Sequence, residues 1–166
     1  MELRDIDEVN RQLEKCNIDL EPEVLDTDDV RELLAGYAKT KKLASYGEAM
    51  LAARLDDAAT VARSSGVSVG KAKAAVDFGN SLKDADEVRE AFKSGELSSD
   101  QVTEISKAEV ASPGSSTELL KLAREESFQA LRESSRRVVL EAEQHRAWLR
   151  ASTRLAEPAP TETSSA

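Results

Sequence analysis

Apolar residues recur at steps of three and four positions along most of this chain, a spacing that places them on one face of an α-helix. The first segment has them at Ile6, Val9, Leu13 and Cys16. This pattern predicts an amphipathic helix over residues 3–17. No segment shows the alternation that is typical of a half-buried strand. We therefore predict an all-α protein, folded as an elongated multi-helix bundle.

The longest apolar stripe spans residues 28–64 with a heptad-like spacing. Its positions are Val30, Leu34, Tyr37, Lys41, Ala44, Glu48, Leu51, Leu55, Ala58 and Ala62. The stripe predicts one long helix, or two helices in line, with Gly36 and Gly47 as candidate bends. So narrow a stripe favours antiparallel packing on another long helix, or a coiled-coil homodimer through residues 30–62.

Capping signals mark the later helix starts. Ser98, with Gln101 three positions on, matches the capping box, in which side chain and backbone bond reciprocally. Ser115 with Glu118 is a second candidate box. The last helical run continues to about Leu149, and a break is expected near Ser127.

The segment VARSSGVSVGKAKAAV, residues 61–76, has the pattern of a helix-turn-helix-like corner. Ala62 is small enough to face the turn, Gly66 permits a left-handed corner, and Ser68 can cap the second helix. The expected inner face of that helix is Val69, Ala72, Ala75 and Val76. Nearby basic side chains can contact phosphates, but the Arg, Asn or Gln residues that read base edges are missing. The segment is either a DNA-contacting element or a structural corner.

The formal net charge is −9, which is not typical of a DNA-binding domain. The acidity is concentrated in residues 1–35, which hold 12 acidic and 4 basic side chains, whereas residues 36–77 hold 7 basic and 4 acidic ones. We divide the chain into an acidic N-terminal helix and linker (1–22), a helical domain (23–155) and a disordered tail (156–166).

Several kinds of site are not expected. One cysteine, Cys16, excludes an internal disulfide, and its place on an apolar face predicts a buried structural thiol. One histidine, His145, gives no metal-binding pair, so we expect it to be solvated or to face a partner. We expect no cofactor, no metal and no catalytic residue. No apolar run reaches the length of a membrane span or secretory signal, which predicts a cytoplasmic protein.

Three segments occur in an order that resembles the bacterial domain-of-unknown-function family 222, whose helical domain usually stands upstream of an HNH endonuclease domain. They are ATVARSSGVSVGKAKAAVDFGNSL (59–82), VREAFKSGELSSDQVTEIS (88–106) and TELLKLAREESFQALRESSRRVVLEAEQHRAWLRASTRL (117–155). The resemblance covers roughly residues 28–155. Where the family has an aromatic-leucine pair before the corner, this chain has Thr60-Val61-Ala62.

The resemblance implies a nucleic-acid context, with DNA and a downstream or separate HNH nuclease domain as candidate partners. The resemblance assigns nuclease activity to no residue of this chain, because one histidine cannot build an HNH site. The candidate DNA-binding residues are Arg63, Lys71, Lys73, Arg132, Arg136, Arg137, Arg146, Arg150 and Arg154. Two alternatives stay open: a helix-mediated interaction or dimerisation module, and an acidic N-terminal segment that covers the basic surface.

Overall fold

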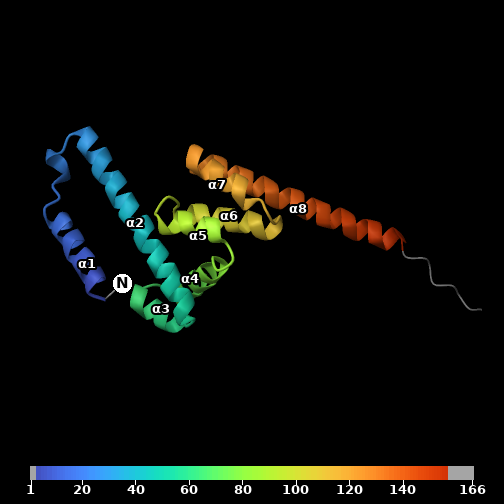
Figure 1. Cartoon of the computed structure of the whole chain (residues 1–166), viewed down its shortest axis with the longest axis horizontal. Helices are drawn as coiled ribbons and strands as arrows, with labels where there is room; N and C mark the ends of the chain where they lie inside the picture. The colour runs from blue at the N-terminus through green and yellow to red at the C-terminus, as the bar shows by residue number, and fades with distance from the viewer. Residues whose placement is uncertain (1–2, 157–166) are drawn as a thin grey trace, which may run out of the picture. The chain divides into compact units, whose positions relative to one another are not determined.

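The computed structural model describes residues 3–156, with side chains from residue 4 to residue 152. Within this range the chain is helical and has no strand (Figure 1), which confirms the predicted all-α class. The elements are α1 (Leu3–Ile18), the 3-10 turn η1 (Pro22–Val24), α2 (Thr27–Leu55), α3 (Ala58–Ser65), α4 (Val69–Ser81), α5 (Asp86–Lys93), α6 (Ser99–Ala111), α7 (Ser116–Glu125) and α8 (Phe128–Ala156). The predicted disordered tail, from residue 157 on, lies outside the described residues.

The chain divides into two compact units, Met1–Ala38 (unit 1) and Lys39–Ala166 (unit 2). Unit 1 contains α1, η1 and the first turns of α2, and none of its described side chains is buried. All buried side chains among the described residues belong to unit 2. A hydrophobic core is therefore a property of unit 2.

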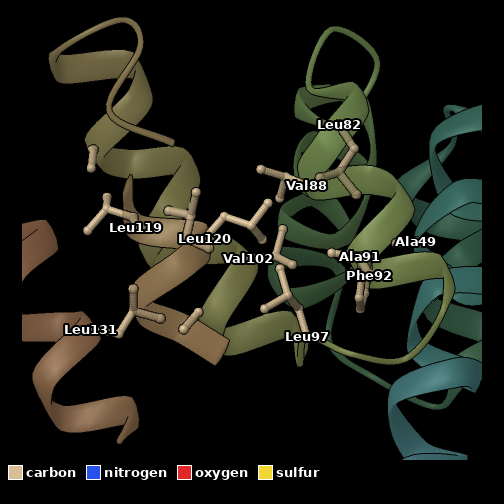
Figure 2. Close-up of a cluster of buried hydrophobic side chains, with 13 residues drawn as sticks. Ala49, Leu82, Val88, Ala91, Phe92, Leu97, Val102, Leu119, Leu120 and Leu131 are labelled. Atoms are coloured by element: carbon tan, nitrogen blue, oxygen red, sulfur yellow. The ribbon is translucent and has the colours of Figure 1, made fainter. Parts of the chain in front are cut away.

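The larger core cluster of unit 2 is centred on Phe92 of α5. The rings of Tyr46 and Phe78 meet Phe92 edge to face, with ring centroids 5.7 and 5.8 Å away, in the geometry that aromatic pairs prefer. Side chains from α2, α5, α6, α7 and α8 gather around this cluster (Figure 2). Its other fully buried members are Leu82, Leu97, Val102, Ile105, Ala108 and Leu131. The helix α6 contacts α5, α7 and α8 and so forms the centre of the unit.

The second core cluster joins α2, α3 and α4 through small side chains. Its buried members are Ala52, Val61, Ala62, Ala72 and Val76. Here α4 approaches α2 so closely that a Cβ atom on Gly79 would lie 2.1 Å from the carbonyl oxygen of Ala49 and 2.8 Å from the Cβ of Ala53. Glycine at position 79 therefore permits the α2–α4 crossing.

We expect Gly79→Ala to lower the free energy of unfolding by about 1–3 kcal/mol, because the added methyl group meets rigid backbone. The measurement is urea unfolding followed by circular dichroism, with an unchanged denaturant slope. Gly47→Ala is the matched control, since Gly47 also lies inside a helix but a methyl group added there would meet nothing within 4 Å. It should stabilise the protein by about 0.5–1 kcal/mol. Equal effects of the two substitutions would contradict the close crossing.

The long helical segment expected over residues 28–64 is interrupted at Asp56. This residue has a left-handed conformation, with φ of 52°, and Asp57 then caps α3 by accepting a hydrogen bond from the backbone N–H of Ala59. Hydrogen bonding to Thr60 lowers the pKa of Asp57, which is fully exposed. Gly36 and Gly47, the candidate bends, both lie inside the continuous helix α2.

The predicted apolar stripe differs from the face that α2 buries in unit 2. The buried residues are Ala49, Ala52 and Ala53, whereas Leu51 and Leu55 of the stripe are 64% and 51% exposed. The prediction that these two leucines pack against another helix of the same chain was therefore wrong. Small alanines form the buried face because α4 packs against α2 at very short range.

The turn Gly95-Glu96-Leu97-Ser98 links three helices. Gly95, with φ of 68°, ends α5, and Leu97 is completely buried. The Glu96 carboxylate pairs with Arg124 of α7, which lowers the pKa of Glu96 despite the opposing effect of partial burial. Ser98 caps α6. The turn therefore fixes the relative positions of α5, α6 and α7.

The capping box predicted at the start of α6 is confirmed. The Ser98 hydroxyl accepts a hydrogen bond from the backbone N–H of Gln101, and the Gln101 side chain accepts one from the backbone N–H of Ser98. The Gln101 amide also donates to the carbonyl oxygen of Ala123 at 3.2 Å. The predicted break near Ser127 is likewise present, between α7 and α8.

The second predicted capping box is wrong. Ser115 makes no side-chain capping bond; instead the Glu109 carboxylate of α6 accepts hydrogen bonds, each 2.8 Å long, from the backbone N–H groups of Gly114 and Ser116. The bond from Gly114 is the main reason that the pKa of Glu109 lies below its ordinary value. Glu109 of the preceding helix therefore caps the start of α7, where Ser115 and Glu118 were predicted to do so.

We expect Glu109→Gln to lower the free energy of unfolding at pH 7 by about 1 kcal/mol, as loss of a helix cap does. Because the folded-state pKa is lowered, the stabilisation by Glu109 is present above the unfolded pKa and is lost as the pH falls through the folded one. The difference from the wild type should therefore shrink in acid. Thermal unfolding from pH 7 to pH 3 measures this. Exposed Glu118→Gln should change stability by less than about 0.5 kcal/mol.

Candidate nucleic-acid interface

The helix-turn-helix-like corner is formed by the end of α3 and the start of α4. Gly66 has φ of 65°, and its backbone N–H donates to the carbonyl oxygen of Ala62, so it ends α3 in the left-handed manner. The Ser68 hydroxyl then accepts from the backbone N–H of Lys71 and caps α4. Ala62 and Ala72 are buried across the corner. The sequence predicted the corner's Gly66 and Ser68 caps correctly.

The three basic candidates of the corner are exposed. Lys71 and Lys73 lie in the first turns of α4, away from its buried residues, and Arg63 lies on α3. The Arg63 guanidinium donates to the Thr60 hydroxyl at 3.1 Å, and Lys73 forms an exposed ion pair with Asp77 at 3.3 Å. Such an ion pair is weak in water, so it leaves the lysine accessible to phosphates.

One residue of the predicted inner face of α4 points elsewhere. Val69 is 59% exposed, whereas Ala72 and Val76 are buried and Ala75 is partly buried. Val69 is the first residue of α4 and precedes the turn that packs on α3, so the helical periodicity extended the inner face one turn too far. Two valines, Val67 and Val69, are thus exposed beside the lysines.

The arginines of α8 form a second candidate set. Arg136, Arg146 and Arg150 follow Arg132 by 4, 14 and 18 positions, and each spacing is close to a whole number of turns at about 3.6 residues per turn. These four arginines therefore share one face of α8, which Glu143 interrupts. Arg137 lies on another face and donates to the Ser134 hydroxyl. The side chain of Arg154 lies outside the described residues.

The first half of the arginine face borders a groove of about 640 Å³ between α6 and α8. Its basic lining residues are Lys107 of α6 with Arg132 and Arg136 of α8. Two acidic residues, Glu104 and Glu133, also line it, and Lys107 pairs with Glu104 at 2.8 Å. The groove therefore has mixed charge, and its arginines are exposed at the rim.

A second groove of unit 2, about 760 Å³, lies between α4, α6 and α8. Its apolar lining includes Phe78, Val110 and Val139, and Arg146 is the candidate residue at its rim. Lys71 and Lys73 are not among the residues that line it. The structure thus brings Arg132 and Arg136 together in one groove but does not join them there with the lysines of the corner.

The remaining residues singled out in the sequence are exposed. Cys16 is exposed, so the prediction of a buried thiol was wrong. The cause is that no side chain described in unit 1 is covered well enough to be buried. His145 stacks on Trp148, with ring centroids 6.2 Å apart, and both are exposed. Among the described residues, no group of three or more His, Cys, Asp or Glu side chains is placed to hold a metal ion.

No helix within residues 3–156 is both long and apolar enough to cross a membrane. Comparisons of the chain with protein-family models, curated proteins and solved structures found no match.

Proposed function

We propose that this chain is a non-catalytic helical accessory module of the HNH-associated family and that it associates with DNA. The observation that carries the proposal is the corner between α3 and α4. There, one face of α4 is buried in a small-residue cluster while Lys71 and Lys73 are exposed near its start. A helix held in this way presents its first turns outward, as the second helix of a DNA-binding corner does.

Contacts to phosphates explain the chemistry of these exposed lysines better than contacts to bases. Lysine ammonium groups and free N–H groups at a helix start both favour anions, and neither specifies a sequence. On α8, Arg132 and Arg150 are 18 residues apart, or about 27 Å at the helical rise of 1.5 Å per residue. That row of arginines is long enough to contact several phosphates of one duplex.

The distribution of charge is compatible with this proposal. Unit 2 carries both candidate sets and is nearly neutral, with 19 basic and 20 acidic side chains in residues 39–166. Residues 1–38 hold the other 12 acidic and 4 basic side chains, which account for most of the net charge of −9. The acidity that counts against DNA binding is therefore a feature of unit 1.

We expect the wild-type protein to bind a fluorescein-labelled duplex at about 50 mM salt, where phosphate contacts are strong, measured by anisotropy. The double variant Lys71→Ala with Lys73→Ala should bind more weakly and reduce the slope of log affinity against log salt by about 2, because two phosphate contacts no longer release counterions. The control removes two exposed lysines elsewhere in unit 2, Lys41 and Lys121. An equal loss in both variants, or no binding by the wild type, would contradict the proposal.

A second candidate function is helix-mediated dimerisation, and the exposure of Leu51 and Leu55 favours it. These leucines lie one turn apart on α2, on the predicted heptad-like stripe. A second copy packed along this row would bury both side chains.

The test is sedimentation velocity at rising protein concentration. If the stripe forms a dimer, the wild type should shift to twice the monomer mass and the double variant Leu51→Asp with Leu55→Asp should stay monomeric. Both residues are exposed in the single chain, so the variant should keep the wild-type circular dichroism spectrum. A wild type that stays monomeric at the highest concentration would rule out this dimer.

A further inference from the structure

Unit 1 contains an apolar groove that the proposed DNA interface does not use. In this unit α1 and the first turns of α2 run in opposite directions (Figure 1), and the Tyr37 hydroxyl donates to the side-chain oxygen of Asn17 at 2.8 Å. The groove has a volume of about 280 Å³. It is lined by Leu20, Pro22, Leu25, Val30, Leu33, Leu34 and Tyr37.

Most side chains that line this groove are exposed. Val30, Leu33 and Leu34 are 41%, 42% and 68% exposed, and no described side chain of residues 4–38 is buried. A segment of this length is too short to bury a core of its own. A contiguous exposed apolar surface on a helical segment is typical of an interaction site.

The surroundings of the groove are strongly acidic. Residues 1–38 hold 12 acidic and 4 basic side chains. Two of those basic residues are already engaged within unit 1, since Arg11 pairs with Glu8 at 2.7 Å and Arg31 pairs with Asp28 at 2.8 Å. Acidic residues such as Glu21, Glu23 and Glu32 alternate in sequence with the residues that line the groove. The flanks therefore attract a positively charged occupant.

We propose that this groove binds a basic amphipathic helix of a partner protein, with the apolar face of that helix in the groove and its Lys and Arg residues against the acidic flanks. The described part of unit 1 is helical and offers no strand edge, so an occupant must satisfy its own backbone hydrogen bonds, as a helix does. A second copy of the chain is disfavoured as the occupant because two unit 1 surfaces, each with a large excess of acidic groups, repel one another.

The test uses the full chain and a designed probe. The probe is a fluorescein-labelled peptide of about 18 residues, or five turns, with leucines at helical spacing and lysines at the remaining positions. The matched peptide has glutamate in place of every lysine. Fluorescence anisotropy should show the lysine peptide binding at least about tenfold more tightly than the glutamate peptide, because only the lysines complement the acidic flanks. Failure of the lysine peptide to bind, or equal binding of the two peptides, would overturn the proposal.

A pair of variants separates docking in the groove from unspecific attraction between charges. Leu34→Asp removes an apolar side chain of the groove and adds a negative charge, so simple attraction predicts tighter binding of the lysine peptide, whereas the groove predicts binding about tenfold weaker. Leu140→Asp is the control, because Leu140 of α8 is likewise an exposed leucine, 46% against 68%, but lies outside the groove. It should leave the affinity unchanged.

Three outcomes overturn the proposal: tighter binding by Leu34→Asp, equal weakening by both variants, and a wild-type dimer that Leu34→Asp alone converts to a monomer. The last outcome would identify a second copy as the occupant. Both substituted residues are exposed, so the circular dichroism spectrum of each variant should match the wild type. The result is independent of DNA binding, because Lys71 and Lys73 are unchanged in both variants.

Discussion

The close approach of α4 to α2 at Gly79 is the packing constraint on which the small-residue core cluster of unit 2 depends. At this point the backbone of one helix lies against the carbonyl oxygen of Ala49 and the methyl group of Ala53. Packing against α2 and α3 positions α4 so that Ala72 and Val76 are buried and Lys71 and Lys73 are exposed. Lys71 and Lys73 thus lie on either side of the buried face of α4, because the helical turn places each of them about 100° from its centre.

Large apolar side chains and short connections determine the larger core. Phe92 is surrounded by side chains from several helices, and the turn that follows it has three different roles: Gly95 ends one helix, Leu97 fills the core, and Ser98 starts the next helix. Every residue of this turn except Glu96 is therefore explained by helix ends and core packing, and Glu96 is explained by its ion pair with Arg124. The role of the turn is to join helices, and the candidate chemistry lies elsewhere, on α4 and α8.

The candidate site was predictable from sequence to different degrees. The corner was correctly located because its signals are local: Gly66 is needed where φ is positive, and Ser68 caps within three residues. The shared face of Arg132, Arg136, Arg146 and Arg150 also follows from helical spacing alone. By contrast, nothing local indicated that Glu109 would cap α7, because that bond joins a side chain to a turn five to seven residues later.

The sequence by itself determined the helical class, most helix boundaries, the charge asymmetry and the candidate basic residues, because these depend on periodicity, capping and composition within one segment. Only the tertiary structure decided which faces are buried. The apolar stripe of α2 predicted that leucines would be buried, but α4 packs closely against the alanines instead. Leu51 and Cys16 are exposed because no neighbouring helix covers them. Burial depends on neighbours distant in sequence, and the spacing of residues within one helix carries no information about those neighbours.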